Sequence, residues 1–123
     1  MKYSLFVFLL MVAVAVPVAY AHHSMVMFDA TKIITLEGTV KEFRFSSPHG
    51  FIELMVQYKA GPIEWSIEMT GPGGLARAGW TPQTLKYGDK VKIACHPLRT
   101  GKSGCNFVAL TLADGRILRT SVE

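Results

Sequence analysis

Alternating hydrophobic and polar residues through most of the chain predict a β-rich domain. Leu36 and Val40 keep a two-residue period, and Phe43 and Phe45 then take the opposite parity. A period of two is the pattern of a half-buried strand, and a change of parity within one strand indicates a β-bulge. The first strand is therefore expected to be long and sharply curved, with its bulge near Lys41-Glu42.

The same alternation predicts four more strands, at residues 52–56, 63–69, 91–95 and 107–112. Glycine- and proline-containing turns separate them, and residues 75–78 are expected to form a short helix between the third and fourth strands. Three strands, a short helix and two strands, with a curved first strand, predict an all-β fold, a small five-stranded OB-type barrel. A β-sandwich or a different small barrel is the alternative.

The first 21 residues have the composition of a signal peptide. Met1-Lys2 precedes an uncharged stretch, and Ala19-Tyr20-Ala21 is a small-x-small cleavage signal. The stretch is near the length that spans a bilayer, so a retained anchor is the alternative. However, its strongly apolar part, Leu5 to Val16, is short and is followed by Pro17. The prediction is a signal peptide at residues 1–21 and one periplasmic or secreted domain at residues 22–123.

Charge adds little to the functional picture. The chain has 13 basic and 9 acidic residues, for a net charge of +4. The basic residues are scattered, with no run and no basic helix. This distribution and the predicted export argue against a nucleic-acid partner, and after cleavage no membrane association is expected. The sequence leaves the oligomeric state open.

Cys95 and Cys105 are the only cysteines. In an exported chain a single pair predicts a disulfide, here across the loop from His96 to Gly104. Cys95 shares the parity of the apolar residues before it, whereas Cys105 is out of step with Val108 and the residues that follow. A bulge at the mouth of the loop would reconcile the two parities. Two free thiols or a soft-metal site are the alternatives.

The predicted cleavage places His22 at the mature N-terminus, where its α-amine and imidazole would chelate one metal ion together. Cu(II) favours nitrogen ligands in a square-planar or tetragonal arrangement. The ordinary pKa of an α-amine is about 7.7–8.0, so its deprotonation near neutral pH costs little. The sequence thus predicts copper as a possible cofactor, ahead of zinc, whose structural sites usually need four Cys or His ligands.

A third nitrogen would complete this site, and His23, His49 and His96 are the candidates. His49 is favoured because the neighbouring Pro48 and Gly50 make its loop tight. Met25 and Met27 add thioethers that suit Cu(I). The alternative interpretation is a soluble, cleavable N-terminus whose methionines pack on the barrel, as Phe28 is expected to do.

No catalytic constellation is visible, so an enzyme is not expected. Glu64 and Glu68 lie on one face of a predicted strand, yet no carboxylate pair is placed at a catalytic separation. Trp65 alternates with apolar residues and is expected in the core. Two functions remain: a small copper-binding protein, and a non-enzymatic periplasmic binding module for a peptide, glycan or partner protein.

Several motifs together resemble a known family. They are His22-His23-Ser24, Met27-Phe28-Asp29, Leu36-Glu37-Gly38-Thr39-Val40-Lys41-Glu42-Phe43, Pro48-His49, Glu64-Trp65, Leu75 with Arg77, Gly79-Trp80, Leu85-Lys86 with Gly88-Asp89, Pro97-Leu98-Arg99, and Leu112-Ala113-Asp114-Gly115-Arg116. With these the chain resembles a small exported bacterial family of unknown function that begins with a His-His-Ser motif. The resemblance covers the whole mature domain and implies an exported barrel without an assigned activity. Such proteins often have glycines where this chain has Cys105, so the disulfide is expected to be particular to this chain.

Overall fold

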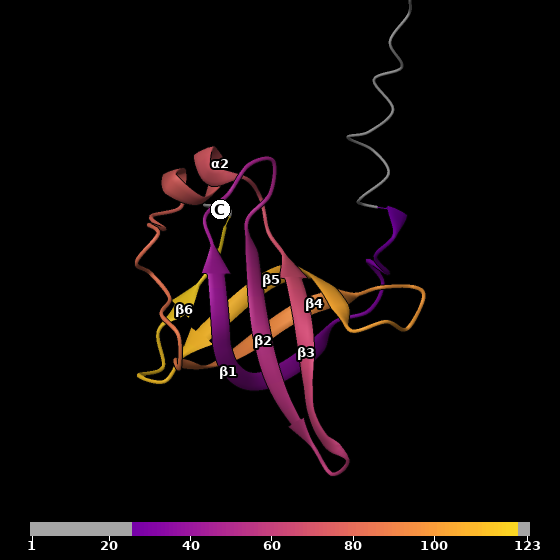
Figure 1. Ribbon diagram of the computed structural model, residues 1–123. Coiled ribbons are helices and arrows are strands. Elements are labelled where there is room, and N and C mark those ends of the chain that lie inside the picture. The colour runs from indigo at the N-terminus through magenta and orange to yellow at the C-terminus, as the bar shows by residue number, and fades with distance from the viewer. Residues whose placement is uncertain (1–25, 121–123) are drawn as a thin grey trace, which may run out of the picture.

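The computed structural model describes residues 26–120, which form a closed β-barrel with one short helix (Figure 1). The elements are β1 (Ile34–Arg44), β2 (Phe51–Tyr58), β3 (Gly61–Glu68), α2 (Pro72–Arg77), β4 (Lys90–Pro97), β5 (Gly104–Leu112) and β6 (Ile117–Leu118). The sheet order is β3-β2-β1-β4-β5-β6, and β3 also pairs with β5 in parallel. This last pairing closes β1 to β5 into a barrel and confirms the predicted OB-type architecture.

The predicted bulge in β1 is confirmed. The register with β2 shifts between Val40, opposite Leu54, and Glu42, opposite Glu53. On its other edge β1 pairs with β4 from Ile34 to Thr39. The bulge bends β1 so that its first half pairs with β4 and most of its second half lies beside β2, which is how one strand joins both halves of the barrel.

The barrel interior is filled by the residues of inward parity. Val40, Ile52, Leu54, Ile67, Leu75, Ile93 and Leu110 have no exposed surface. Trp80 covers one end of the core, where its ring lies 5.8 Å from that of Phe43 and 5.6 Å from that of Phe107, centre to centre. The Trp80 indole Nε1–H donates to the Arg119 carbonyl oxygen at 2.8 Å, which satisfies its one polar atom.

The structure corrects two strand boundaries. β3 begins at Gly61 and Pro62, which were expected to belong to the preceding turn. The positive φ of Gly61, 122°, allows the tight turn after Tyr58. Ser66 directs its N–H toward β5, to the Ser103 carbonyl at 3.2 Å. Pro62 has the same parity as Ser66, so its backbone nitrogen faces the same edge of β3. Because β5 pairs with β3 only from Ser66 to Glu68, the missing N–H of Pro62 removes no hydrogen bond between strands.

The second correction concerns the loop between β4 and β5. It was expected to start at His96, but β4 continues through Pro97. His96 lies opposite Asn106 in the β4–β5 ladder, and Pro97 lies opposite Cys105. The C-terminal segment expected as a short tail pairs with β5 as the two-residue strand β6. The predicted leader at residues 1–21 and its cleavage site lie outside the described residues.

Candidate functional site

The structure describes only some of the site residues that the sequence predicts. His22, His23 and Met25 lie outside the described residues. Met27 is half exposed, at 51%. Cys95 and Cys105 form a disulfide with their Cα atoms 5.6 Å apart, and both are fully buried. The alternatives of free thiols and of a soft-metal site at these two residues are therefore not realised.

A bulge in β5 accommodates the disulfide, as the out-of-step parity of Cys105 predicted. The β4–β5 register shifts between Ala94, opposite Ala109, and Cys95, opposite Phe107, so it skips Val108. The shift brings Cys105 and Phe107 inward together with Leu110 further along the same strand. The side chains of adjacent strand residues point to opposite faces. His96 therefore faces outward while Cys95 faces the core.

The first described residues form a strap, residues 26–29, along the β4–β5 loop. Phe28 is buried and makes an antiparallel bridge with Leu98. The Asp29 N–H donates to the Pro97 carbonyl at 2.8 Å. Arg99 donates its backbone N–H to the Met27 carbonyl at 2.9 Å and its Nε–H to the Val26 carbonyl at 3.1 Å. The strap is thus fixed to the barrel up to its first described residue.

Asp29 closes the strap with a local turn. Its Oδ1 accepts the Thr31 hydroxyl at 2.6 Å and the Thr31 N–H at 3.1 Å. These two hydrogen bonds, with smaller contributions from the charges of Arg99 and Lys32, hold the pKa of the Asp29 carboxyl below its ordinary value. The carboxylate therefore stays ionised at neutral pH and holds the turn that leads into β1.

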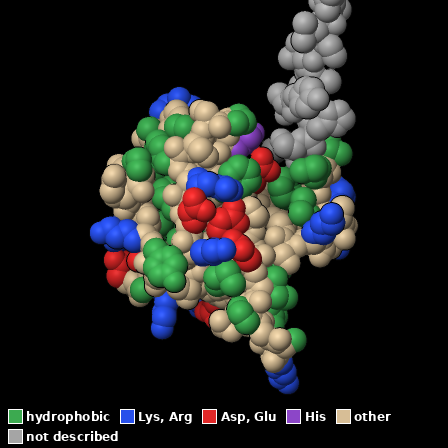
Figure 2. All heavy atoms as spheres, in the orientation of Figure 1, with side chains coloured by type: hydrophobic (Ala, Val, Ile, Leu, Met, Phe, Trp, Pro, Cys, Tyr) green, Lys and Arg blue, Asp and Glu red, His purple; other side chains and the backbone are tan. Residues whose placement is uncertain are grey.

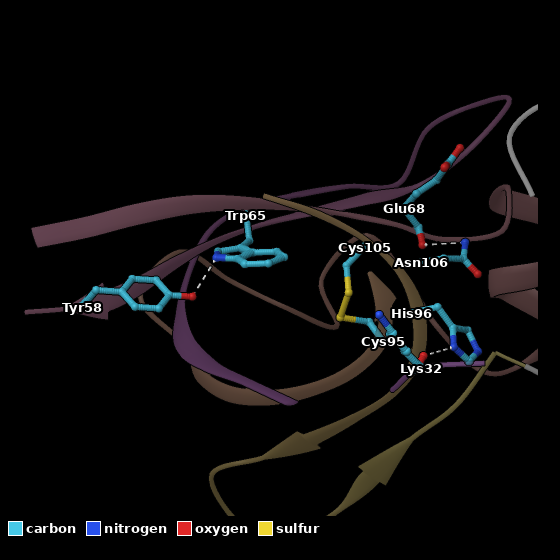
Figure 3. The surroundings of a disulfide bond; sticks show 8 residues. All are labelled: Lys32, Tyr58, Trp65, Glu68, Cys95, His96, Cys105 and Asn106. Atoms are coloured by element: carbon cyan, nitrogen blue, oxygen red, sulfur yellow. Dashed lines mark hydrogen bonds between the residues drawn. A yellow bond between two sulfur atoms is a disulfide. The ribbon is translucent and has the colours of Figure 1, made fainter. Parts of the chain in front are cut away.

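His96 contacts the segment that follows the strap. Its Nδ1 lies 2.6 Å from the carbonyl oxygen of Lys32 (Figure 3). A carbonyl oxygen only accepts, so Nδ1 carries the proton and Nε2 carries the free lone pair. A ring N–H bonded to a backbone carbonyl is the usual arrangement behind a metal-binding histidine. The Lys32 carbonyl therefore orients the His96 ring at the base of the β4–β5 loop, and in the neutral ring Nε2 is the nitrogen without a proton.

His49 has the same arrangement at the β1–β2 loop. Its Nδ1 lies 3.0 Å from the Met69 carbonyl oxygen, which leaves Nε2 with the lone pair. The Glu68 carboxylate oxygen Oε1 is 3.7 Å from the same Nδ1. The ring is partly exposed, at 40%. His49 thus lies partly exposed on the β1–β2 loop, and in the neutral ring its Nε2 carries no proton.

Glu68 and Asn106 lie between the two histidines. Glu68 pairs with Asn106 across the β3–β5 seam, and Asn106 pairs with His96. The Asn106 side-chain amide donates to the Glu68 carbonyl oxygen at 3.4 Å (Figure 3). These residues form one polar row on the outside of the barrel. Within residues 26–120 no three His, Cys, Asp or Glu side chains are close enough to hold a metal ion by themselves.

The outer surface of β1, β2 and β3 carries interspersed acidic and basic groups, visible on the face shown in Figure 2. Lys41 and Glu64 pair at 3.1 Å, and Arg44 and Glu53 pair at 2.6 Å. The Arg44 guanidinium also lies 4.9 Å from the centre of the Phe51 ring. Phe51 is thus partly buried and lies within cation–π distance of this guanidinium.

A shallow groove lies on another side of the barrel, across β1, β4 and β5. Its volume is about 550 Å³, within the size range of small-ligand sites. Its lining includes Glu37, Thr39, Lys90, Lys92, Thr111 and Leu112. Glu37 and Lys92 pair at 2.9 Å, whereas no carboxylate of the described chain lies within 4.0 Å of the Lys90 ammonium. No sequence pattern indicated this groove, since β1 is distant in the chain from β4 and β5.

Trp65 corrects an expectation about the core. It packs against the core but is only partly buried, and its indole Nε1–H donates to the Tyr58 hydroxyl at 3.0 Å. Ile63, two residues earlier, is 43% exposed. The β2–β3 hairpin extends past the barrel, as Figure 1 shows, so the inward-facing side chains at its tip have little core to pack against.

Within residues 26–120 no helix is long and apolar enough to cross a membrane.

Comparison with known proteins supports the assignment of family and fold. A family described as of unknown function, DUF6152, matches residues 9–107. The chain belongs to the family of unknown function DUF6152. This confirms the resemblance seen in the sequence, while the His-His-Ser motif itself stays untested. No curated protein matches this DUF6152 chain.

Among solved structures, the DUF6152 barrel is similar to Rim1, a mitochondrial single-stranded DNA-binding protein from S. cerevisiae. The TM-score is 0.51 with 12% sequence identity, over 67% of this chain and 93% of Rim1. At this identity the likeness shows the OB-type fold alone. The fold prediction is therefore confirmed by an independent structure.

Proposed function

We propose that this protein is an exported copper-binding barrel that holds Cu(II) through the α-amine and the imidazole of a mature N-terminal His22. Two nitrogens from one residue form a chelate that suits the tetragonal geometry of Cu(II). His23 adds an imidazole next to this chelate, and Met25 and Met27 add thioethers for the Cu(I) state. The proposed role is binding, without catalysis.

The strap is the observation that supports this proposal most directly. It begins four residues after His22, with Val26 held by Arg99 and Phe28 buried beside Leu98. These contacts fix the chain to the barrel at the point where the described residues begin. A ligand segment attached to a fixed point loses less freedom when it binds an ion than one attached to a free tail.

Export is part of the same proposal. Cu(II) persists outside the reducing cytoplasm, and the buried disulfide between Cys95 and Cys105 suits an oxidising compartment. The predicted signal peptide, residues 1–21, supplies both the route and the free amine. The periplasm or the exterior of the cell is the proposed location, with no membrane or nucleic-acid partner.

Titration with Cu(II) tests the proposal. The correctly processed protein should bind about one Cu(II) tightly with nitrogen-dominated coordination in its electron paramagnetic resonance spectrum. A matched control with one glycine placed before His22 keeps every side chain but removes the amine chelate, and it should bind more weakly. Affinity should also fall below neutral pH, because protons compete for the amine and the imidazoles. Equal affinity of the two proteins would rule out the proposed chelate.

The groove across β1, β4 and β5 favours a second candidate, a non-enzymatic binding module for a peptide, glycan or partner protein. Its volume of about 550 Å³ and the Lys90 ammonium, which pairs with no carboxylate among residues 26–120, suit a ligand that carries an acidic group. Lys90→Gln distinguishes this candidate, because it should weaken such a ligand and leave Cu(II) affinity unchanged. A library of acidic peptides and glycans, read by amide chemical shifts at Lys90 and Thr111, is the measurement.

A further inference from the structure

We infer that the open edge of β3, residues 62–65, binds an extended segment of a partner protein in which a basic residue stands between two apolar residues. The open edge is a different surface from the strap and from the groove across β1, β4 and β5. The inference therefore goes beyond the proposed copper site and does not depend on copper binding.

The open edge exists because the barrel closes over a short seam. β3 and β5 pair only from Ser66, opposite Gly104, to Glu68, opposite Asn106. β3 itself begins earlier, at Gly61. In Figure 1 the loop between β4 and β5 leaves the barrel in a different direction from the tip of the β2–β3 hairpin. Among residues 26–120, the first half of β3 therefore pairs with β2 on one side and with no strand on the other.

The backbone of Glu64 faces this unpaired side. The Ser66 N–H donates to the Ser103 carbonyl at 3.2 Å, so Ser66 faces the β5 side of the strand. Alternate residues direct their N–H and C=O groups to the same edge, so the groups of Glu64 and the carbonyl of Pro62 face that side too. Within residues 26–120, no hydrogen bond from the loop beyond the seam reaches any of the three.

These three groups identify the partner as an extended peptide. A donor and two acceptors at strand spacing are matched by the backbone of another extended chain. In such strand addition the main chain supplies the hydrogen bonds, and alternate side chains supply the selectivity. Pro62 has no N–H, so it limits the added ladder to the Glu64 N–H and the carbonyls of Glu64 and Pro62. The paired part of the partner is therefore short, about three residues.

The inner side of the open edge favours apolar residues in the partner. Ile63 is 43% exposed although its parity is inward, and Trp65 is only partly buried. The Trp65 indole N–H donates to the hydroxyl of Tyr58, which holds the ring in place (Figure 3). The two partner residues beside Ile63 and Trp65 would cover this apolar surface and remove it from water.

The Glu64 carboxylate selects the middle residue of the partner. It is 42% exposed and pairs with Lys41 at 3.1 Å. A second copy of this chain, added about a two-fold axis at Glu64, would place two Glu64 side chains directly opposite each other. Like charges at directly opposed positions are destabilising, whereas opposite charges are favourable. A lysine or arginine opposite Glu64 is therefore preferred, and a second copy is disfavoured.

Two peptides and two variants test the inference in the disulfide-bonded protein. The probe is the peptide Thr-Val-Lys-Val-Thr with both ends blocked, and Thr-Val-Glu-Val-Thr is its matched control. Glu64→Pro removes the N–H at the open edge without removing a hydrogen bond to β2, since that N–H faces away from β2. Glu64→Gln keeps the N–H and removes the charge. Amide spectra without peptide establish that each variant is folded.

The lysine peptide should cause saturable chemical-shift changes at the Glu64 amide and at the Trp65 indole N–H. Its affinity should fall at least about fivefold in Glu64→Pro, because one peptide carbonyl is left without a donor. The wild-type protein should prefer the lysine peptide to the glutamate peptide by about two- to fivefold, as expected for one cross-strand charge pair. Glu64→Gln should bind both peptides with similar affinity.

Three results would overturn the inference. One is the absence of saturable shifts at Glu64 with the lysine peptide, and another is equal affinity of the two peptides for the wild-type protein. The third is a concentration-dependent shift of the Glu64 amide without peptide, together with a dimeric mass, because it would make a second copy the occupant. Equal affinity of the wild type and a folded Glu64→Pro variant would also contradict the ladder. If Glu64→Pro does not fold, the two peptides and Glu64→Gln still decide the outcome.

Discussion

Phe28 and Leu98 form an antiparallel bridge outside the regular strands, and it fixes the start of the domain to the loop between β4 and β5. Phe28 is buried although it lies before the first strand. Arg99, the neighbour of Leu98, adds two hydrogen bonds to the carbonyls of Val26 and Met27. The bridge therefore connects the candidate ligand residues at the N-terminus to the rigid barrel.

Phe28→Ala should release the strap. Removal of a buried phenylalanine costs about 3–5 kcal/mol in a closed core, and the lower end is expected because the strap can move away from the surface. Cu(II) affinity should fall as well, since residues 22–25 lose their fixed starting point. Chemical denaturation and Cu(II) titration are the measurements. Val26→Ala, which alters a side chain that is 68% exposed, is the matched control and should change neither quantity.

Asp29 should make the strap sensitive to acid. Its pKa is lowered in the folded protein, chiefly by the hydrogen bonds from Thr31. A lowered folded-state pKa stabilises the protein above the unfolded value, near 3.8, and this contribution is lost as the pH falls from there through the folded pKa. The amides of Asp29 and Arg99, which donate to the Pro97 and Met27 carbonyls, should therefore lose protection from hydrogen exchange in that range. In Asp29→Asn the acid-dependent step should be absent, and its persistence would assign the step to another group.

The disulfide should stabilise the barrel without being needed for its topology. Cys95 and Cys105 are ten residues apart, and closing so short a loop contributes roughly 2.5–3 kcal/mol on the chain-entropy model. Both thiols should resist alkylation until a reductant is added under denaturing conditions, because both are fully buried. Thermal unfolding with and without reductant measures the effect. An unchanged melting temperature would contradict this account.

Gly38 should not tolerate a larger residue. A Cβ at this position would lie 2.5 Å from the Met55 carbonyl oxygen and 2.8 Å from Leu54 Cγ, where β1 crosses β2. Gly38→Ala should therefore destabilise the protein by about 1–3 kcal/mol, the usual cost of overpacking. Gly73→Ala is the control. Its Cβ would meet only Arg77 Nη1 at 3.5 Å within α2, so helix propensity should make it neutral or stabilising.

Processing should produce His22 as the first residue. Ala19-Tyr20-Ala21 is the cleavage signal, and the copper proposal requires the free amine that follows. N-terminal sequencing and intact mass of the protein recovered from the exported fraction are the measurements. A mature chain that begins at Ser24 or later, or that retains Met1, would remove the amine chelate and favour the binding-module candidate.

The strand pattern was readable because the alternation of side chains is a local property of a strand. The period of two located the five barrel strands, and the change of parity after Val40 located the bulge in β1. The out-of-step Cys105 located a second bulge, which the structure has between Ala94 and Cys95 in the β4–β5 register. Local pattern failed at the tip of the β2–β3 hairpin, where Ile63 has inward parity but lies beyond the core.

The sequence by itself determined the candidate ligands, the cysteine pair and the barrel order, since each depends on residue type and on spacing along the chain. It did not determine which histidine lies near the N-terminal segment. His49 and His96 are both oriented by backbone carbonyls, of Met69 and Lys32, and these contacts join residues 20 and 64 positions apart. Only barrel closure decides such distances, because β3 meets β5 in space and not in sequence. The contacts of the strap with Leu98 and Arg99 have the same origin, because they join residues about 70 positions apart that only the folded barrel brings together.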